Sequence, residues 1–285
     1  SKEQRRPARL TFVVDVSGSM SSRNRLPLVR RALKMLVDEL REGDEVSIVV
    51  YGSRAKLFLD WTEATRKQSI KNKIMRLRTQ GSTNAEEGLV LGYRQAAKNF
   101  SNGCDNRVIL CSDGVANVGK RGPEAILKEI KKYSDKGIYL TTVGFGRNNY
   151  SDVMMERLAN KGDGVYAYVD NENEARRIFV ENLTGTLVTV GKDAKIQVEF
   201  SEKAVKSYRL LGYENRDVKD EDFRNDKVDA GEVGAGHSVT ALYELELSDD
   251  LGSSLGTVRV RYQSPRSSRV TEIQEVLDNK CIKAS

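Results

Sequence analysis

The sequence contains one histidine, His237, among its 285 residues. Zinc sites built from several histidines are therefore excluded, and so are most Ser–His or Cys–His nucleophile systems unless His237 is the base. No run of about 18 apolar residues occurs, so the sequence encodes no transmembrane helix. The three cysteines, Cys104, Cys111 and Cys281, form no CxxC motif. This pattern indicates neither a disulfide framework nor a cysteine metal site.

Proline is scarce, with 4 residues, while 39% of the residues are apolar and 31% are charged. Such a composition suits a globular protein with a sizeable core. The net charge of +6 is uneven, because residues 1–190 carry net +9 and residues 191–285 carry net −3. This change in net charge along the chain predicts two units with different surfaces. No nucleic-acid motif accompanies the basic surplus, so we expect no nucleic-acid binding.

Short apolar runs alternate with amphipathic segments as far as residue 183. Strands alternating with helices of this length favour a mostly parallel sheet covered on both faces, an α/β doubly wound fold. Gly88, Gly92 and Ala96 form a small-residue strip suited to close packing against a sheet. Cys111 is expected to be a small core side chain. The expected strands are 10–16, 46–51, 56–59, 108–111, 138–145 and 165–169, and the expected helices are 27–40, 64–79, 85–99, 123–134, 151–159 and 172–183.

The hydrophobic pattern changes near residue 190. Apolar residues then alternate with polar ones in 196–200, 239–245 and 258–262, the period of half-buried antiparallel strands. Residues 213–236 are charged and contain glycines, and we expect them to form a long solvated connection. The sequence thus predicts a β-rich C-terminal unit without a convincing helix.

Oxygen-bearing side chains gather where ligands bind in open parallel α/β sheets, at the carboxyl ends of the strands. Asp15, Ser17 and Ser19 follow the first expected strand, Asp113 follows the fourth, and Thr83 lies in the loop between two helices. Alternate residues of an extended loop face the same side. Oxygen ligands without nitrogen or sulfur suit Mg²⁺, or else Mn²⁺ or Ca²⁺. The alternative is ordinary capping and turn chemistry, which favours the same residue types.

The charge of this set determines what such an ion would bind. If the direct ligands are neutral hydroxyls and the carboxylates act through water, the cation stays strongly electrophilic. It would then favour an anionic oxygen from outside. We therefore expect a partner protein that presents an Asp or Glu side chain.

The spacing Asp15-x-Ser17-x-Ser19, together with Thr83 and Asp113, resembles the metal-ion-dependent adhesion site of von Willebrand factor type A (VWA) domains. The resemblance covers residues 8–186 and implies a six-stranded sheet with one antiparallel edge strand. It also implies that Ser17, Ser19 and often Thr83 are direct metal ligands. Asp15 and Asp113 would then act mostly through water.

Residues 192–200, 212–216 and 229–238 resemble the C-terminal region of a bacterial family of VWA lipoproteins. That resemblance implies a β-rich domain over residues 187–285 and a tail, or remnant of a preceding segment, over residues 1–7. The family is generally exported and lipid-anchored, which implies an extracytoplasmic setting, periplasmic or cell-surface. The loop 113–119 departs from the commoner family variant, which has a second acidic residue there.

Three functions remain open from the sequence. A cation-dependent binding module is the one we adopt, and it is not an enzyme. A metal-assisted hydrolase needs a general base or nucleophile beside the metal, and the one histidine lies in the other unit. In the third alternative, a structural subunit, the metal only stabilises the fold. Unlike a binding module, it would have no coordination position open to a partner's carboxylate.

Overall fold

The computed structural model describes residues 6–114, 123–146, 152–182, 189–211, 218, 220–225, 228, 231–234, 240–249, 251–264, 267 and 269–278. The chain divides into two compact units, residues 1–188 and residues 189–285. His237 and Cys281 lie outside the described residues.

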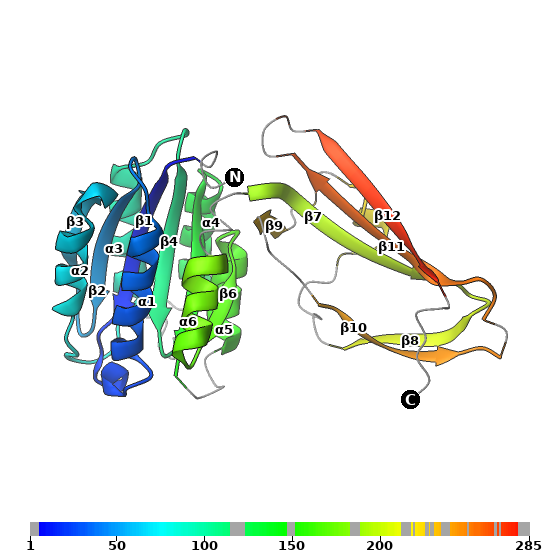
Figure 1. Ribbon diagram of the computed structural model, residues 1–285, viewed down its shortest axis with the longest axis horizontal. Coiled ribbons are helices and arrows are strands. Elements are labelled where there is room, and N and C mark those ends of the chain that lie inside the picture. The colour runs from blue at the N-terminus through cyan, green and yellow to red at the C-terminus, as the bar shows by residue number, and fades with distance from the viewer. Residues whose placement is uncertain are drawn as a thin grey trace. The chain divides into compact units, whose positions relative to one another are not determined.

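The first unit is built on a six-stranded sheet with the order β3-β2-β1-β4-β5-β6 (Figure 1). Neighbouring strands are parallel except β2 and β3, which pair antiparallel at the edge. The predicted mostly parallel sheet with an antiparallel edge strand is confirmed. The strands are β1 (Ala8–Asp15), β2 (Glu45–Tyr51), β3 (Ala55–Glu63), β4 (Asp105–Ser112), β5 (Ile138–Phe145) and β6 (Tyr166–Val169).

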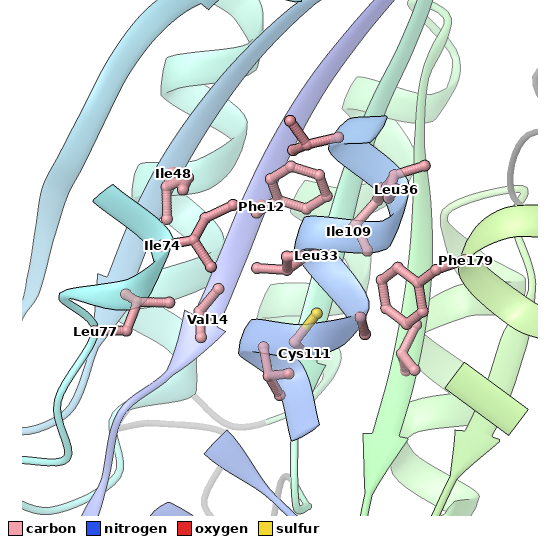
Figure 2. Packing of buried hydrophobic residues seen from close by; sticks show 14 of the residues in the cluster. Phe12, Val14, Leu33, Leu36, Ile48, Ile74, Leu77, Ile109, Cys111 and Phe179 are labelled. Carbon is pink, nitrogen blue, oxygen red and sulfur yellow. The ribbon is translucent and has the colours of Figure 1, made fainter. Parts of the chain in front are cut away.

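Helices cover both faces of this sheet. One buried cluster joins β1 side chains to the helices α1 (Leu26–Glu39), α2 (Lys67–Met75) and α6 (Glu172–Arg176). Figure 2 shows Phe12 and Val14 beside Leu33 and Leu36 of α1. A second cluster joins the opposite face to α3 (Ala85–Lys98), α4 (Pro123–Ser134) and α5 (Asp152–Lys161). Cys111 is fully buried in the first cluster, as predicted for a core side chain.

The small-residue strip of α3 packs against the sheet. A Cβ at Gly92 would lie 2.3 Å from Val13 Cγ2, and one at Gly88 would lie 2.5 Å from the Tyr51 ring. Both glycines therefore let α3 approach the strands closely, as their spacing predicts.

Two expected helices differ from those in the structure. The segment 64–79 begins with a 3-10 turn, Ala64–Arg66, and its α-helix ends at Met75. There the N–H groups of Arg76 and Leu77 bond to carbonyls three residues back, which closes the last turn. The segment 172–183 is α-helical only to Arg176, and a π-helical turn, Arg177–Asn182, follows.

The second unit consists of antiparallel strands. A four-stranded sheet has the order β12-β11-β7-β9, and β8 pairs with β10. The alternation near 196–200, 239–245 and 258–262 corresponds to β7, β10 and β11. The strands are β7 (Thr189–Phe200), β8 (Val205–Leu211), β9 (Gly231–Gly234), β10 (Leu242–Leu247), β11 (Ser254–Gln263) and β12 (Val270–Asp278).

The connection 213–236, expected to be entirely loop, contains the strand β9. Its sequence, Gly-Glu-Val-Gly, holds a single apolar side chain, so it shows no alternation that could have predicted a strand. Within the described residues, no helix is both long and apolar enough to cross a membrane.

Candidate metal site

Parallel pairing brings the ends of β1 and β4 together. Val14 pairs with Cys111, so the next residues along each strand, Asp15 and Ser112, lie side by side at the carboxyl edge. Ser17 and a 3-10 turn, Gly18–Ser21, follow β1, and Asp113 follows β4. The loops that carry the predicted ligands therefore meet because the two strands are neighbours.

Asp15 has no exposed surface, and hydrogen bonds fix both of its carboxylate oxygens. The Ser17 N–H donates to Oδ1 at 2.8 Å, and the Ser112 hydroxyl donates to Oδ2 at 2.8 Å. Burial raises the pKa of Asp15 above its ordinary value, and the nearby charge of Asp113 adds to this effect, while the bonds from Ser17 and Ser112 oppose it. The ionised carboxylate is thus held in place at a cost that a nearby cation would relieve.

The two serine hydroxyls lie together in front of Asp113. Ser17 Oγ and Ser19 Oγ are 3.0 Å apart, and Ser19 Oγ donates to Asp113 Oδ1 at 3.1 Å. Mg²⁺ binds oxygens at about 2.0–2.1 Å in octahedral geometry, so adjacent ligands lie about 3.0 Å apart. The spacing of these oxygens matches that edge length.

Thr83 lies in a neighbouring loop that the backbone fastens to this site. The Gly18 N–H donates to the Gly81 carbonyl at 3.0 Å, and the Gln80 N–H donates to the Val16 carbonyl. The side chain of Thr83 is partly exposed and makes no hydrogen bond to a described residue. The structure therefore links Asp15, Ser17, Ser19 and Asp113 directly, and it places the loop of Thr83 beside them.

Two residues of this site were not among the predicted ligands. Ser112 holds Asp15, as described above. The guanidinium of Arg25 donates through Nη1 to the Ser19 carbonyl at 2.7 Å and forms an ion pair with Asp113 Oδ2 at 2.7 Å. The site thus combines two carboxylates, the hydroxyls of Ser17, Ser19 and Ser112, and the positive charge of Arg25.

Tyr51 lies beneath the site. Its side chain is fully buried, and burial together with the charge of Asp15 raises its pKa well above the usual value. Its phenol therefore stays neutral and supplies no negative charge.

The donor set fits a hard divalent cation better than zinc. Among the described residues, no group of three or more His, Cys, Asp and Glu side chains could hold a metal ion. A cation at this edge would therefore depend on serine and threonine hydroxyls, with two carboxylates balancing its charge. Such oxygen ligands suit Mg²⁺, Mn²⁺ or Ca²⁺.

The family description "von Willebrand factor type A domain" matches residues 10–182 of this chain, which include all five predicted ligands. The chain belongs to this family. A second description, "Uncharacterized protein YfbK, C-terminal", matches residues 185–254. The VWA domain and the domain that follows it thus account for most of the sequence.

A relative named "Uncharacterized protein YfbK", from Escherichia coli strain K12, is 42% identical over 262 residues. The match covers 92% of this chain and 45% of that protein, so the chain spans less than half of the relative's length.

Two solved structures share the fold. A von Willebrand factor type A protein from Catenulispora acidiphila aligns with a TM-score of 0.60 and 16% identity, over 96% of this chain and 67% of that one. Proximal thread matrix protein 1 from the mussel byssus, "with zinc occupied MIDAS motif", aligns with a TM-score of 0.51 and 20% identity. That match covers 63% of this chain and 46% of the mussel chain.

Proposed function

We propose that this chain is a binding module in which a divalent cation captures an acidic side chain of a partner protein. Ser17, Ser19 and Thr83 would bind the ion directly, and Asp15 and Asp113 would act mostly through water. The observation that carries the proposal is the hydrogen-bonded cluster of Asp15, Ser17, Ser19 and Asp113 at the carboxyl edge of the sheet.

Family membership supports this proposal. Domains of the VWA family are typically protein-interaction modules. The mussel protein of the same fold has a zinc-occupied MIDAS motif. For this chain we favour Mg²⁺, because every donor at the site is an oxygen. We also propose the extracytoplasmic setting that the lipoprotein resemblance implies.

The residues of this chain prepare the site in three ways. Hydrogen bonds from Ser17 and Ser112 orient the Asp15 carboxylate and oppose the rise in its pKa that burial causes. Ser17, at the start of the turn Gly18–Ser21, and Ser19 within it present two hydroxyls with a spacing that suits adjacent ligands. Asp113 accepts from Ser19 and keeps negative charge near the ion. When bound, the cation would supply an electrophilic position for an external carboxylate oxygen.

The first alternative function, a metal-assisted hydrolase, would need a general base beside the metal, and within the described residues the acidic side chains of the site already have protein partners. Both oxygens of Asp15 are engaged, and Asp113 is shared between Ser19 and Arg25. A non-enzymatic role accounts for the described residues better.

Thermal unfolding with and without Mg²⁺ tests the metal site. An ion that binds only the native state stabilises it by about 2.7 kcal/mol at a hundredfold excess over its Kd. We expect Mg²⁺ to raise the Tm of the parent protein but not that of Ser17→Ala or Thr83→Ala. Ser69→Ala, at an exposed serine of α2, is the control that should keep the shift. A parent protein that does not respond would contradict the proposal.

A second measurement separates the binding module from a structural subunit. In the Mn²⁺-loaded protein, water exchanging at the ion enhances proton relaxation. A peptide bearing Asp should lower this enhancement by displacing water, while the same peptide with Asn should not. Metal-dependent stability without any response to the Asp peptide would favour a purely structural metal.

A further inference from the structure

Two polar contacts hold the Arg25 guanidinium beside the predicted ligands. Its Nη1 donates to the Ser19 carbonyl and pairs with Asp113 Oδ2, each at 2.7 Å. The backbone after β5 leaves room for its stem, since a Cβ at Gly146 would lie 2.7 Å from Arg25 Nε. Gly146 has a φ of +95°, which favours glycine there. The contacts with Ser19 and Asp113, and the space beside Gly146, therefore fix the position of the Arg25 guanidinium.

The charge of Arg25 competes with that of a divalent ion. The arginine side chain is 20% exposed and that of Asp113 is 10% exposed, so water screens their interaction only partly. Asp113 divides its oxygens, with Oδ1 accepting from Ser19 and Oδ2 paired with Arg25. A cation held near Ser19 would therefore share one carboxylate with a second cation, and like charges repel.

We infer that Arg25 is an internal counter-ion that sets the affinity of the site for its metal. Without metal, Arg25 neutralises Asp113 and limits its repulsion with Asp15. With metal, the same positive charge weakens ion binding and eases ion release. This role rests on the proposed function, and it makes Arg25 a residue that tunes affinity without being a ligand.

The opposite role is also physically possible and predicts the opposite sign. If Arg25 chiefly held the Asp113 carboxylate in the orientation that the ion needs, its removal would weaken metal binding. The affinity of a variant without the guanidinium therefore decides between the two roles.

Calorimetric titration with Mg²⁺ would compare the parent protein with Arg25→Gln, Arg25→Lys and the control Arg23→Gln. Arg23 is exposed on the same loop, and its replacement changes the net charge equally. We expect Arg25→Gln to bind Mg²⁺ on the order of tenfold more tightly than Arg23→Gln. Arg25→Lys, which keeps the charge, should stay near the parent. The gap between the two Gln variants should narrow with added salt.

A second readout does not involve the metal. In chelator, Arg25→Gln should have a lower Tm than Arg23→Gln, because Asp113 loses its counter-charge while Asp15 remains buried nearby. Equal Mg²⁺ affinities of the two Gln variants, or a weaker Arg25→Gln, would overturn the counter-ion role. If Arg25→Gln does not fold in chelator, a Mg²⁺ affinity of Arg25→Lys well above that of the parent would overturn it. If the parent and all variants fail to bind Mg²⁺, the metal site itself is wrong.

Discussion

The carboxylate of Asp15 is buried at the end of β1. Its burial should make the stability of the protein depend on pH. Burial raises its pKa, so the ion-free native protein binds a proton more readily than the unfolded chain does. As pH rises from the unfolded value, about 3.9, through the raised native value, the ion-free protein loses stability. The ionised Asp15 carboxylate would add to the stability of the native protein only when a cation is bound.

Asp15→Asn should therefore be more stable than the parent in chelator at pH 7. The amide can still accept from the Ser17 N–H and can donate to Ser112 Oγ, which has an alternative acceptor in the Gly114 carbonyl. The stability difference should shrink as pH falls toward about 4, because the parent carboxylate then becomes neutral. Urea unfolding midpoints between these pH values would measure it. A difference that does not change with pH would show that the Asp15 charge has no part in it.

Ser112→Ala should destabilise the protein by about 1–3 kcal/mol, since it leaves the Asp15 Oδ2 atom buried without its donor. The change also removes the acceptor for the Gly114 N–H, which Ser112 Oγ binds at 3.1 Å. Equilibrium urea unfolding in chelator measures this cost. Ser69→Ala, on the surface of α2, should change stability by less than about 0.5 kcal/mol. Equal costs for the two changes would contradict this account of Ser112.

The cluster formed by Asp15, Ser17, Ser19 and Asp113 could be predicted because its members follow strand ends at local spacings. The contributions of Ser112 and Arg25 could not. Ser112 depends on the register between β1 and β4, which places it against Asp15. Arg25 depends on how the turn after Ser19 folds back toward Asp113. Neither contact follows from residue types along one segment, and the metal-ligand roles of all five predicted residues stay predictions.

Among the elements, hydrophobic patterning predicts β1, β2, β4 and β5 well, because these strands are largely apolar and buried on both faces. The edge strand β3 is mostly exposed or half-buried, and its predicted range, 56–59, covers only part of it. Hydrophobic patterning predicts helix ends less well. The segment 172–183 has an α-helical hydrophobic pattern, but its backbone changes to a π-helical turn at Arg177–Asn182. Such turns are rare, and the pattern does not signal one. In the second unit, β8 and β12 carry exposed apolar and polar residues together, so their alternation is weak.

The close approach of α3 to β1 predicts that a larger side chain at Gly92 destabilises the protein. Gly92→Ala would improve helix propensity by about 1 kcal/mol in an open position. Here the new Cβ would lie 2.3 Å from Val13 Cγ2, so we expect a net destabilisation of about 1–3 kcal/mol. Chemical denaturation of Gly92→Ala beside Gly103→Ala, whose Cβ would lie 3.8 Å from its nearest neighbour, measures the difference. A more stable Gly92→Ala would mean that the helix can move away freely.

At the scale of the whole molecule, the buried cores lie within separate units. Both large clusters belong to residues 1–188, and the cluster around Ala204, Val205 and Leu255 belongs to residues 189–285. All five predicted ligands and Arg25 also lie in the first unit. Its length suits a single domain that folds alone. The proposed metal should therefore stabilise the first unit without needing the second.

Differential scanning calorimetry of the full chain should then show two transitions, of which Mg²⁺ raises one. The isolated fragment 1–188 should unfold cooperatively and show the same Mg²⁺ shift as that transition, because ligand stabilisation depends only on the unit that binds. Ser17→Ala in the full chain should abolish the shift and leave the other transition in place. A single transition that moves as a whole with Mg²⁺ would instead mean that the units unfold together, and the second unit would then share in the response to the ion.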